Sequence, residues 1–319
     1  MAKDNNGTAC AEKFKTLIGG QALIEGILMR GPDKQAIVVR SPDGLVRQIT
    51  PITLTKERHP ILGWPLIRGV VNFGSAMVNG VKALMFSANY FPDDEDAEPS
   101  KLDRWVEKKF GEEKMEQFIL YTAVLLGVAF SVGLFILLPT FLSGLIPGLR
   151  GNYVWRNLAE GILKIVIFMT YMILISKMKD MKRVFSYHGA EHKTIRCYEA
   201  RLPLTVENVR PMTRLHPRCG TSFLLVVVCI SILVGAFIHS NNTLARMGLH
   251  LLMLPIVVAV AYELNRFVGR HDNWFTRILT KPGMWMQNFT TNEPDDSMIE
   301  VAIEALTAVI PEREGADKW

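Results

Sequence analysis

The sequence predicts a mostly α-helical, multi-pass membrane protein with four transmembrane helices, a small N-terminal antiparallel β-sheet and cytoplasmic amphipathic helices. Three observations lead to this fold class. Hydrophobic residues make up 49% of the 319 residues, and the mean hydropathy is positive, which is typical of membrane proteins. Several apolar runs approach the roughly 20 residues that a helix needs to cross a bilayer. Near the N-terminus, apolar and polar side chains alternate as they do in strands.

The sheet is predicted over residues 18–56. The apolar stretch Ala36–Val39 and the mixed apolar and polar stretch Leu45–Ile49 lie on either side of the turn signal Ser41–Gly44. This pattern predicts a hairpin. A preceding strand over Gln21–Met29 would complete a small antiparallel sheet.

The next part of the chain is predicted to lie at the membrane surface. Residues 60–91 are apolar, but prolines, glycines and charged side chains interrupt them, which favours an amphipathic or re-entrant segment over a lipid-spanning helix. The acidic residues Asp93–Asp96 indicate an exposed linker. An amphipathic helix over 101–117 is then expected to lead into the bilayer.

Four transmembrane helices are predicted, over residues 118–138, 158–176, 221–238 and 247–262. The first contains no charged side chain and is expected to end near Pro139. In the second, Glu160 and Lys164 stand one helical turn apart and can form an ion pair. Pro255 predicts a kink in the fourth.

Charge asymmetry predicts the orientation of these helices. Residues 177–220 contain ten Lys and Arg, whereas 143–157 contain two and 239–246 contain one. Because cytoplasmic loops carry the excess of basic residues, the basic loop is expected in the cytoplasm, and four spans place both termini there as well. Residues 1–17 are a polar leader that lacks the features of a secretory signal peptide. The predicted localisation is the cytoplasmic membrane.

The C-terminal part is predicted to cover the cytoplasmic face. Residues 271–290 are aromatic and basic, which suits a segment resting on the membrane surface. An amphipathic helix is expected after Pro294, and residues 311–319 form a tail. Residues 18–310 are read as a single integrated domain, because the cytoplasmic pieces are too small to form separate cores.

A metal-binding pattern lies in the basic loop. On a helix, His188, Glu191 and His192 project from one face, and two imidazoles one turn apart can chelate one cation. H-x-x-E-H is the inverted form of the zinc-hydrolase motif, in which the Glu handles the proton of the attacking water. His216 and Cys219 could supply further ligands of the type that zinc prefers.

Two interpretations of this pattern remain open. In a catalytic site, three protein ligands hold the metal and Glu191 acts as the general base, with Glu263 as a candidate downstream ligand. The alternative for Glu263 is an ion pair with Arg266 on the same helix face. In a structural site, the shell closes with four protein ligands and has no open position; these are His188, His192, His216 and Cys219. Glu25 in the first strand either lies in a local ion pair or on a solvated face, or it points at the metal region.

The chain also resembles the bacterial DUF1385 family of YqhQ-like membrane proteins. The resemblance covers residues 18 to 310 and implies the fold, a bacterial membrane location and a metal-dependent enzyme. It rests on these strings: GGQALIEGILMRGP (19–32), RGVVNFG (68–74), YHGAEHKTIRCYE (187–199), HPRCGTSF (216–223), YELNR (262–266) and TTNEPDDSMIEVAIEAL (290–306).

The expected function is a zinc-dependent, hydrolase-like activity at the membrane. The alternative is an accessory factor or chaperone for membrane proteins whose zinc is purely structural. Expected partners are the lipid bilayer and either anionic lipids or other membrane proteins. Anionic lipids suit the basic side chains around the metal motif, and partner helices suit the amphipathic segment 60–91. The net charge of +5 is explained by the basic cytoplasmic loop, and no nucleic-acid-binding motif accompanies it, so no nucleic-acid partner is expected.

Overall fold

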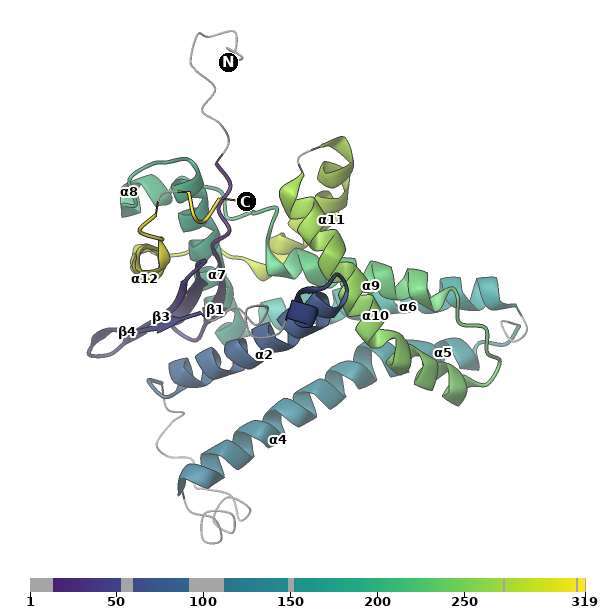
Figure 1. Ribbon diagram of the computed structural model, residues 1–319. Coiled ribbons are helices and arrows are strands. Elements are labelled where there is room, and N and C mark those ends of the chain that lie inside the picture. Colours follow the sequence, from purple (N-terminus) through teal and green to yellow (C-terminus); the bar gives the residue numbers. More distant parts are fainter. Residues whose placement is uncertain are drawn as a thin grey trace. The chain divides into compact units, whose positions relative to one another are not determined.

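The computed structural model describes residues 14–52, 60–91, 112–148, 152–271, 273–313 and 315–318 (Figure 1). These residues are mostly helical and include one four-stranded sheet. Most of the predicted leader and residues 101–111 of the predicted amphipathic helix lie outside them.

The chain divides into two compact units. The first contains Met1–Phe91, Met172–Ile230 and Pro255–Trp319, and the second contains Pro92–Tyr171 and Ser231–Leu254. Three helices, α6, α9 and α10, begin in one unit and end in the other. The single integrated domain stays a prediction.

The N-terminal sheet has four strands in the order β1-β2-β3-β4, all antiparallel. The predicted hairpin is confirmed as β3 (Lys34–Ser41) and β4 (Gly44–Pro51). The single strand predicted over Gln21–Met29 is wrong, because the chain turns at Glu25, where φ is +51°. The turn separates two paired strands, β1 (Gly19–Leu23) and β2 (Gly26–Arg30).

Helices pack on both faces of this sheet, as the period-two alternation of strand side chains requires. Ile27, Met29 and Val38 belong to the cluster that includes helices α7 (Lys179–Glu199) and α12 (Asp296–Val309). On the other face, Leu28, Ile37 and Val39 cluster with side chains of α2 (Ile67–Ala88) and of the residues that follow it. Figure 1 shows α7 and α12 beside the purple strands. The main core of the first unit therefore lies between the sheet, α7 and α12.

Residues 60–91 form a 3-10 turn, η1 (Pro60–Gly63), and helix α2. Gly69 lets α2 approach α10, because an added Cβ would lie 3.0 Å from the Cα of Ala259. Other α2 side chains are large, apolar and exposed, as expected of an amphipathic helix at an interface; they include Ile67, Val70, Phe73, Met77, Val78 and Leu84.

Among the described residues, three helices are long and apolar enough to cross a membrane. The first covers Tyr121–Leu145 and combines the part of α4 (Glu112–Val132) from Tyr121 onward with the π-helical η2 (Gly133–Leu137) and α5 (Leu138–Leu145). The predicted end near Pro139 is wrong. The π turn ends at Leu137, two positions before this proline, and such turns allow a helix to continue where one regular hydrogen bond is lost.

The other two candidate spans are α6 (Tyr153–Lys177) and α10 (Thr243–Arg270), and Pro255 lies inside α10. The prediction of four spans is corrected to three helices that are long enough to cross a membrane. The span predicted over 221–238 is the helix α9 (Gly220–Gly235), which is shorter than the other three. Its last apolar residues belong to a turn, in which the Ile238 N–H donates to the Gly235 carbonyl. The prediction included these residues because they are apolar, although the backbone no longer forms a helix there.

The predicted basic loop is largely helical. It contains α7 and the short α8 (Val206–Val209). The predicted membrane-surface segment forms α11 (Trp274–Thr290), which starts with a capping box at Asn273. The predicted amphipathic C-terminal helix is confirmed as α12. Thr16, at the end of the predicted leader, donates from its hydroxyl to Asp317 in the tail at 2.6 Å.

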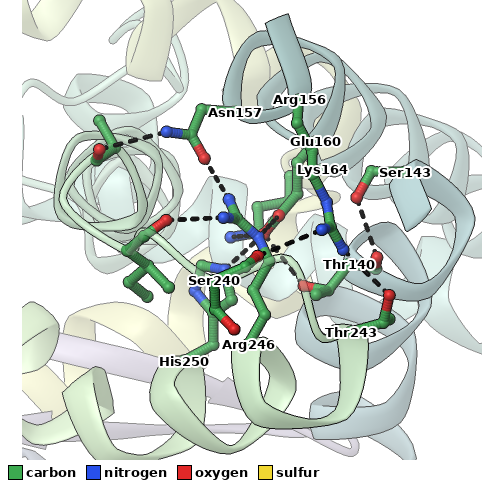
Figure 2. Close-up of polar contacts among 12 residues, drawn as sticks. Thr140, Ser143, Arg156, Asn157, Glu160, Lys164, Ser240, Thr243, Arg246 and His250 are labelled. Carbon is green, nitrogen blue, oxygen red and sulfur yellow. Dashed lines mark hydrogen bonds and ion pairs between the residues drawn. The ribbon is translucent and has the colours of Figure 1, made fainter. Parts of the chain in front are cut away.

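The second unit contains a buried cluster of charged side chains centred on Glu160 (Figure 2). The predicted pair is confirmed, because Lys164 Nζ lies 3.1 Å from Glu160 Oε1. Arg246 Nε donates to Glu160 Oε2 at 2.8 Å, and His250 Nε2 lies 2.7 Å from Oε1. Thr140 also donates to Glu160, at 3.0 Å. One carboxylate therefore accepts contacts from α5, α6 and α10.

Candidate metal centre

Helix α7 positions the histidine motif against the sheet. Tyr187, Ala190 and Ile195 are buried in the core of the first unit, and the helical period turns His188, Glu191 and His192 toward the adjacent pocket. Gly189 allows the chain after α11 to cross α7 closely, because an added Cβ would lie 2.0 Å from the carbonyl oxygen of Asn292.

Three of the predicted metal ligands come together. One candidate ligand atom from each of His188, His192 and Cys219 lies within 4.8 Å of the other two. His192 and Cys219 are buried, and His188 is partly buried. The two imidazoles come from α7, and the cysteine directly precedes α9, so residues 31 positions apart meet at one point.

Hydrogen bonds fix which nitrogen of each imidazole carries the proton. His188 Nδ1 lies 2.7 Å from the Thr290 carbonyl oxygen, and His192 Nδ1 lies 2.6 Å from the Arg214 carbonyl oxygen. A carbonyl oxygen only accepts, so both Nδ1 atoms must donate. In the neutral rings each Nε2 then keeps its lone pair, and His188 Nε2 lies 3.2 Å from Cys219 Sγ. This arrangement of a second nitrogen bound to a carbonyl is common in metal-ligating histidines.

The sulfur of Cys219 is surrounded by donors. The backbone N–H of Thr221 donates to Sγ at 3.3 Å, and the Thr221 hydroxyl lies 3.0 Å from it. Burial alone raises the pKa of the Cys219 thiol, but the nearby His192 and these hydrogen bonds outweigh burial and lower the pKa below its usual value. The lowered pKa increases the share of thiolate, which is the form that binds metals.

Glu191 lies in the same pocket wall and is almost fully buried. Its Oε1 accepts the backbone N–H of Gly20 at 2.9 Å, whereas Oε2 is buried without a hydrogen-bond partner in the described part of the chain. Burial raises the pKa of Glu191 to about 7, although His188 and the Gly20 N–H oppose the shift. A carboxyl group in this environment can exist in either protonation state near neutral pH.

The remaining predicted ligands lie apart from this group. His216 is buried, and its Nε2 lies 3.4 Å from Glu199 Oε2, while its ring centroid is 5.6 Å from that of His192. Glu263 forms a two-bond ion pair with Arg68 of α2, with distances of 2.6 and 2.5 Å. Neither residue belongs to the three-ligand group, and the partner of Glu263 is Arg68 and not the predicted Arg266.

Glu25 forms a local ion pair, the first of its two predicted alternatives. Arg183 of α7 donates to both carboxylate oxygens, and the Tyr187 hydroxyl donates to Oε2 at 3.1 Å. This ion pair connects the β1–β2 turn to α7, the helix that carries His188 and His192.

The three-ligand group opens onto a pocket of about 650 Å³. The pocket is bounded by β1, α2, α7 and the start of α9, and its lining is a mixture of apolar and polar side chains. His188, Glu191, His192 and Cys219 all line it. Arg30 and Arg218 are the cationic side chains of the lining. A small or amphiphilic molecule can therefore reach the ligand atoms and Glu191 together.

Several residues that shape the site were not identified from the sequence. Thr290 and Arg214 orient the histidines through backbone carbonyls, and Gly20 contacts Glu191 through its N–H. Nearly every residue has a backbone N–H and carbonyl, so the spacing of residue types could not identify these contacts. The only indication in the sequence was that Gly20 and Thr290 lie in two of the strings that carry the family resemblance, those that begin at Gly19 and Thr290.

Comparison with known proteins confirms that resemblance. The DUF1385 family model, described as a protein of unknown function, matches residues 64–312. The chain is 32% identical over 307 residues to the uncharacterized protein YqhQ of Bacillus subtilis (strain 168), an alignment that covers 93% of each protein. No solved structure matches the chain. The family match and the similarity to a bacterial relative agree with the strings found in the sequence, and the chain belongs to the DUF1385 family.

Proposed function

We propose that this protein is a membrane-embedded, zinc-dependent hydrolase-like enzyme whose centre is held by His188, His192 and Cys219. The observation that carries the proposal is the orientation of both imidazoles: each Nδ1 donates to a backbone carbonyl, which turns the Nε2 lone pair toward the buried sulfur. Two nitrogens and one thiolate are ligands of the types that zinc favours, and a shell of three protein ligands with a free fourth position is typical of catalytic zinc.

A second observation supports a cation in this pocket. Glu191 Oε2 is buried in the pocket wall without a hydrogen-bond partner among the described residues. A buried polar atom of this kind carries a desolvation cost unless something in the pocket satisfies it. When bound, zinc would act as a Lewis acid and lower the pKa of an attacking water.

Glu191 is then the group that moves the proton. Its Oε1 is held by the Gly20 N–H, which fixes the carboxyl group in the pocket wall and leaves Oε2 without a partner among the described residues. Glu191 would accept a proton from the attacking water and return it to the leaving group, the usual role of a general acid–base. Arg30 and Arg218 on the pocket wall favour a substrate that carries negative charge.

The metal content of the purified protein tests the site. We expect about one zinc per chain, and His192→Ala and Cys219→Ser should each reduce it strongly, because each removes one of three ligands. His216→Ala should keep the metal, since His216 contacts Glu199 instead. His239→Ala serves as the matched control, because His239 is exposed. Elemental analysis measures all four variants. Wild-type protein without metal would refute the proposed centre, and metal loss in His216→Ala would indicate a four-ligand shell.

We further propose that α9 crosses the bacterial cytoplasmic membrane despite its length, so that both termini lie in the cytoplasm. The sheet, α7 and α12 pack in one core and must lie on one side of the membrane. Between α7 and α12 the chain passes through α9 and the candidate span α10, so α10 alone would leave α12 on the wrong side. The 16 residues of α9 extend roughly 24 Å, a mismatch that local bilayer thinning can accommodate.

Reporter fusions test this topology. Fusions at residues 205 and 315 should report the cytoplasm, because both positions belong to the unit that contains the packed core. A fusion at residue 100 should do the same, because this position precedes the first candidate span in the sequence. Fusions at 150 and 240 should report the outside. Residue 150 lies between the first candidate span and α6, and residue 240 lies between α9 and α10. A cytoplasmic signal at 240 would contradict the crossing of α9, and one at 150 would contradict the topology as a whole.

A further inference from the structure

A second pocket, of about 580 Å³, lies in the first unit and is strongly basic. The end of α7, the end of α10 and the first half of α11 form its walls, together with the residues that precede β1. Its lining includes one carboxylate, Glu199, which pairs with Arg218. The cationic side chains of the lining are Lys15, Arg196, Arg218, Arg277 and Lys281.

Three of these cations come from two different helices that line the pocket. Arg277 and Lys281 stand one turn apart on α11, so both side chains project from the same face. Arg196 comes from α7, and its Nε donates to the Leu215 carbonyl oxygen at 2.7 Å, which holds the guanidinium in place. An excess of cations around one hollow favours an anion with several acceptor oxygens, and Arg and Lys are the side chains that bind phosphate in proteins.

The position of the pocket along the chain indicates where the anion comes from. Val268 and Gly269, in the last turns of the candidate span α10, line the pocket. The following helix α11 exposes Trp274, Phe275 and Ile278. Large aromatic and apolar side chains just beyond a spanning helix are typical of the level of lipid headgroups. Basic pockets at this level on the cytoplasmic side bind anionic headgroups.

We propose that this pocket binds the phosphate of an anionic phospholipid headgroup. The site is distinct from the three-ligand metal group, and its existence does not depend on a metal. Arg218 lines both pockets, so a lipid held here lies next to the wall of the metal pocket.

Lipid binding to the full-length protein tests the proposal. Native mass spectrometry in detergent measures the affinity for added phosphatidylglycerol, phosphatidylcholine or soluble glycerol phosphate. The wild type should bind phosphatidylglycerol several-fold more tightly than the other two. Lys281→Gln should weaken phosphatidylglycerol binding about fivefold, the ratio that corresponds to about 1 kcal/mol per basic side chain. Arg277→Gln combined with Lys281→Gln should weaken it further.

Lys179→Gln provides the matched control. Lys179 is exposed, as Lys281 is, but it lies at the start of α7 and does not line the pocket. It should leave the affinity unchanged, which supports a local site and not general attraction to basic residues. Equal loss in Lys179→Gln and Lys281→Gln would overturn the site, as would equal binding of phosphatidylcholine. Equally tight binding of glycerol phosphate would overturn the assignment to a lipid. Metal content plays no part in any outcome.

Discussion

The Glu160→Gln variant is expected to lose most of its folded protein from the membrane. Glu160 is the carboxylate around which Lys164, Arg246 and His250 gather, and all four side chains are buried. Glutamine keeps the shape but removes the negative charge, so Lys164 and Arg246 lose the carboxylate that compensates them. Removing one partner of a buried ion pair costs about 3–5 kcal/mol, comparable to much of the stability of a domain.

A second ion pair of this chain supplies the control for that experiment. Glu300 pairs with Arg40 at 2.8 Å, but its side chain is 55% exposed. Exposed pairs contribute at most about 1 kcal/mol, so Glu300→Gln should be nearly silent. Membrane abundance and the denaturant midpoint of the purified protein measure both variants. Equal abundance and equal midpoints would show that the Glu160 cluster does not hold the second unit together.

The same cluster shows how far spacing alone can predict a site. The Glu160–Lys164 pair was predictable because the two residues stand one turn apart on one helix, so local geometry alone brings them together. Arg246 and His250 reach Glu160 from a helix more than 80 positions later. Which distant helix packs beside α6 depends on tertiary contacts that periodicity does not encode.

The metal group follows the same rule. His188 and His192 were predictable as a pair on one helix face, and of the two residues in the H-x-x-C motif the structure brings Cys219 beside them. His216 and Glu263 were plausible by residue type, yet each has a nearer partner, Glu199 and Arg68 respectively. Both partners lie on other elements, so composition could not identify them.

The fold was predicted where the pattern is local and missed where backbone geometry decides. Alternation predicted the β3–β4 hairpin because Gly44 marks the turn. The β1–β2 turn was missed because it contains Ile24 and Glu25, which carry no turn signal, and Glu25 adopts a positive φ that few non-glycine residues adopt. The length of α9 was overestimated for a similar reason, since its last apolar residues form a turn.

The Glu191→Gln variant distinguishes the proposed enzyme from the alternative function, an accessory factor with a structural metal. The enzyme requires the Glu191 carboxylate for proton transfer, whereas the accessory factor does not. In the proposed enzyme, Glu191 is not a ligand but moves a proton, so the variant should keep its metal and its fold. Its activity should fall by roughly 10²–10⁴-fold, the usual contribution of a general acid–base. Glutamine preserves the shape and can still accept the Gly20 N–H through its carbonyl oxygen.

In the alternative function, an accessory factor or chaperone for membrane proteins, the metal would only stabilise the fold. The exposed apolar face of α2 favours this alternative, because it offers a surface for partner helices. Glu191→Gln should then be nearly silent in cells, whereas His188→Ala should reduce the amount of folded protein by removing a ligand. The two functions thus predict opposite results for Glu191→Gln, whereas His188→Ala is impaired in both.

The decisive comparison needs no knowledge of the substrate. A deletion strain is complemented with the wild type, Glu191→Gln, His188→Ala or the control Glu300→Gln, and growth phenotype, protein abundance and zinc content are measured together. An abundant, zinc-loaded Glu191→Gln protein that fails to complement would support catalysis, because only the proton-transfer group has been lost. Full complementation by Glu191→Gln would exclude the proposed enzyme, since the carboxylate would then be dispensable. Loss of abundance in His188→Ala alone would instead indicate a structural metal.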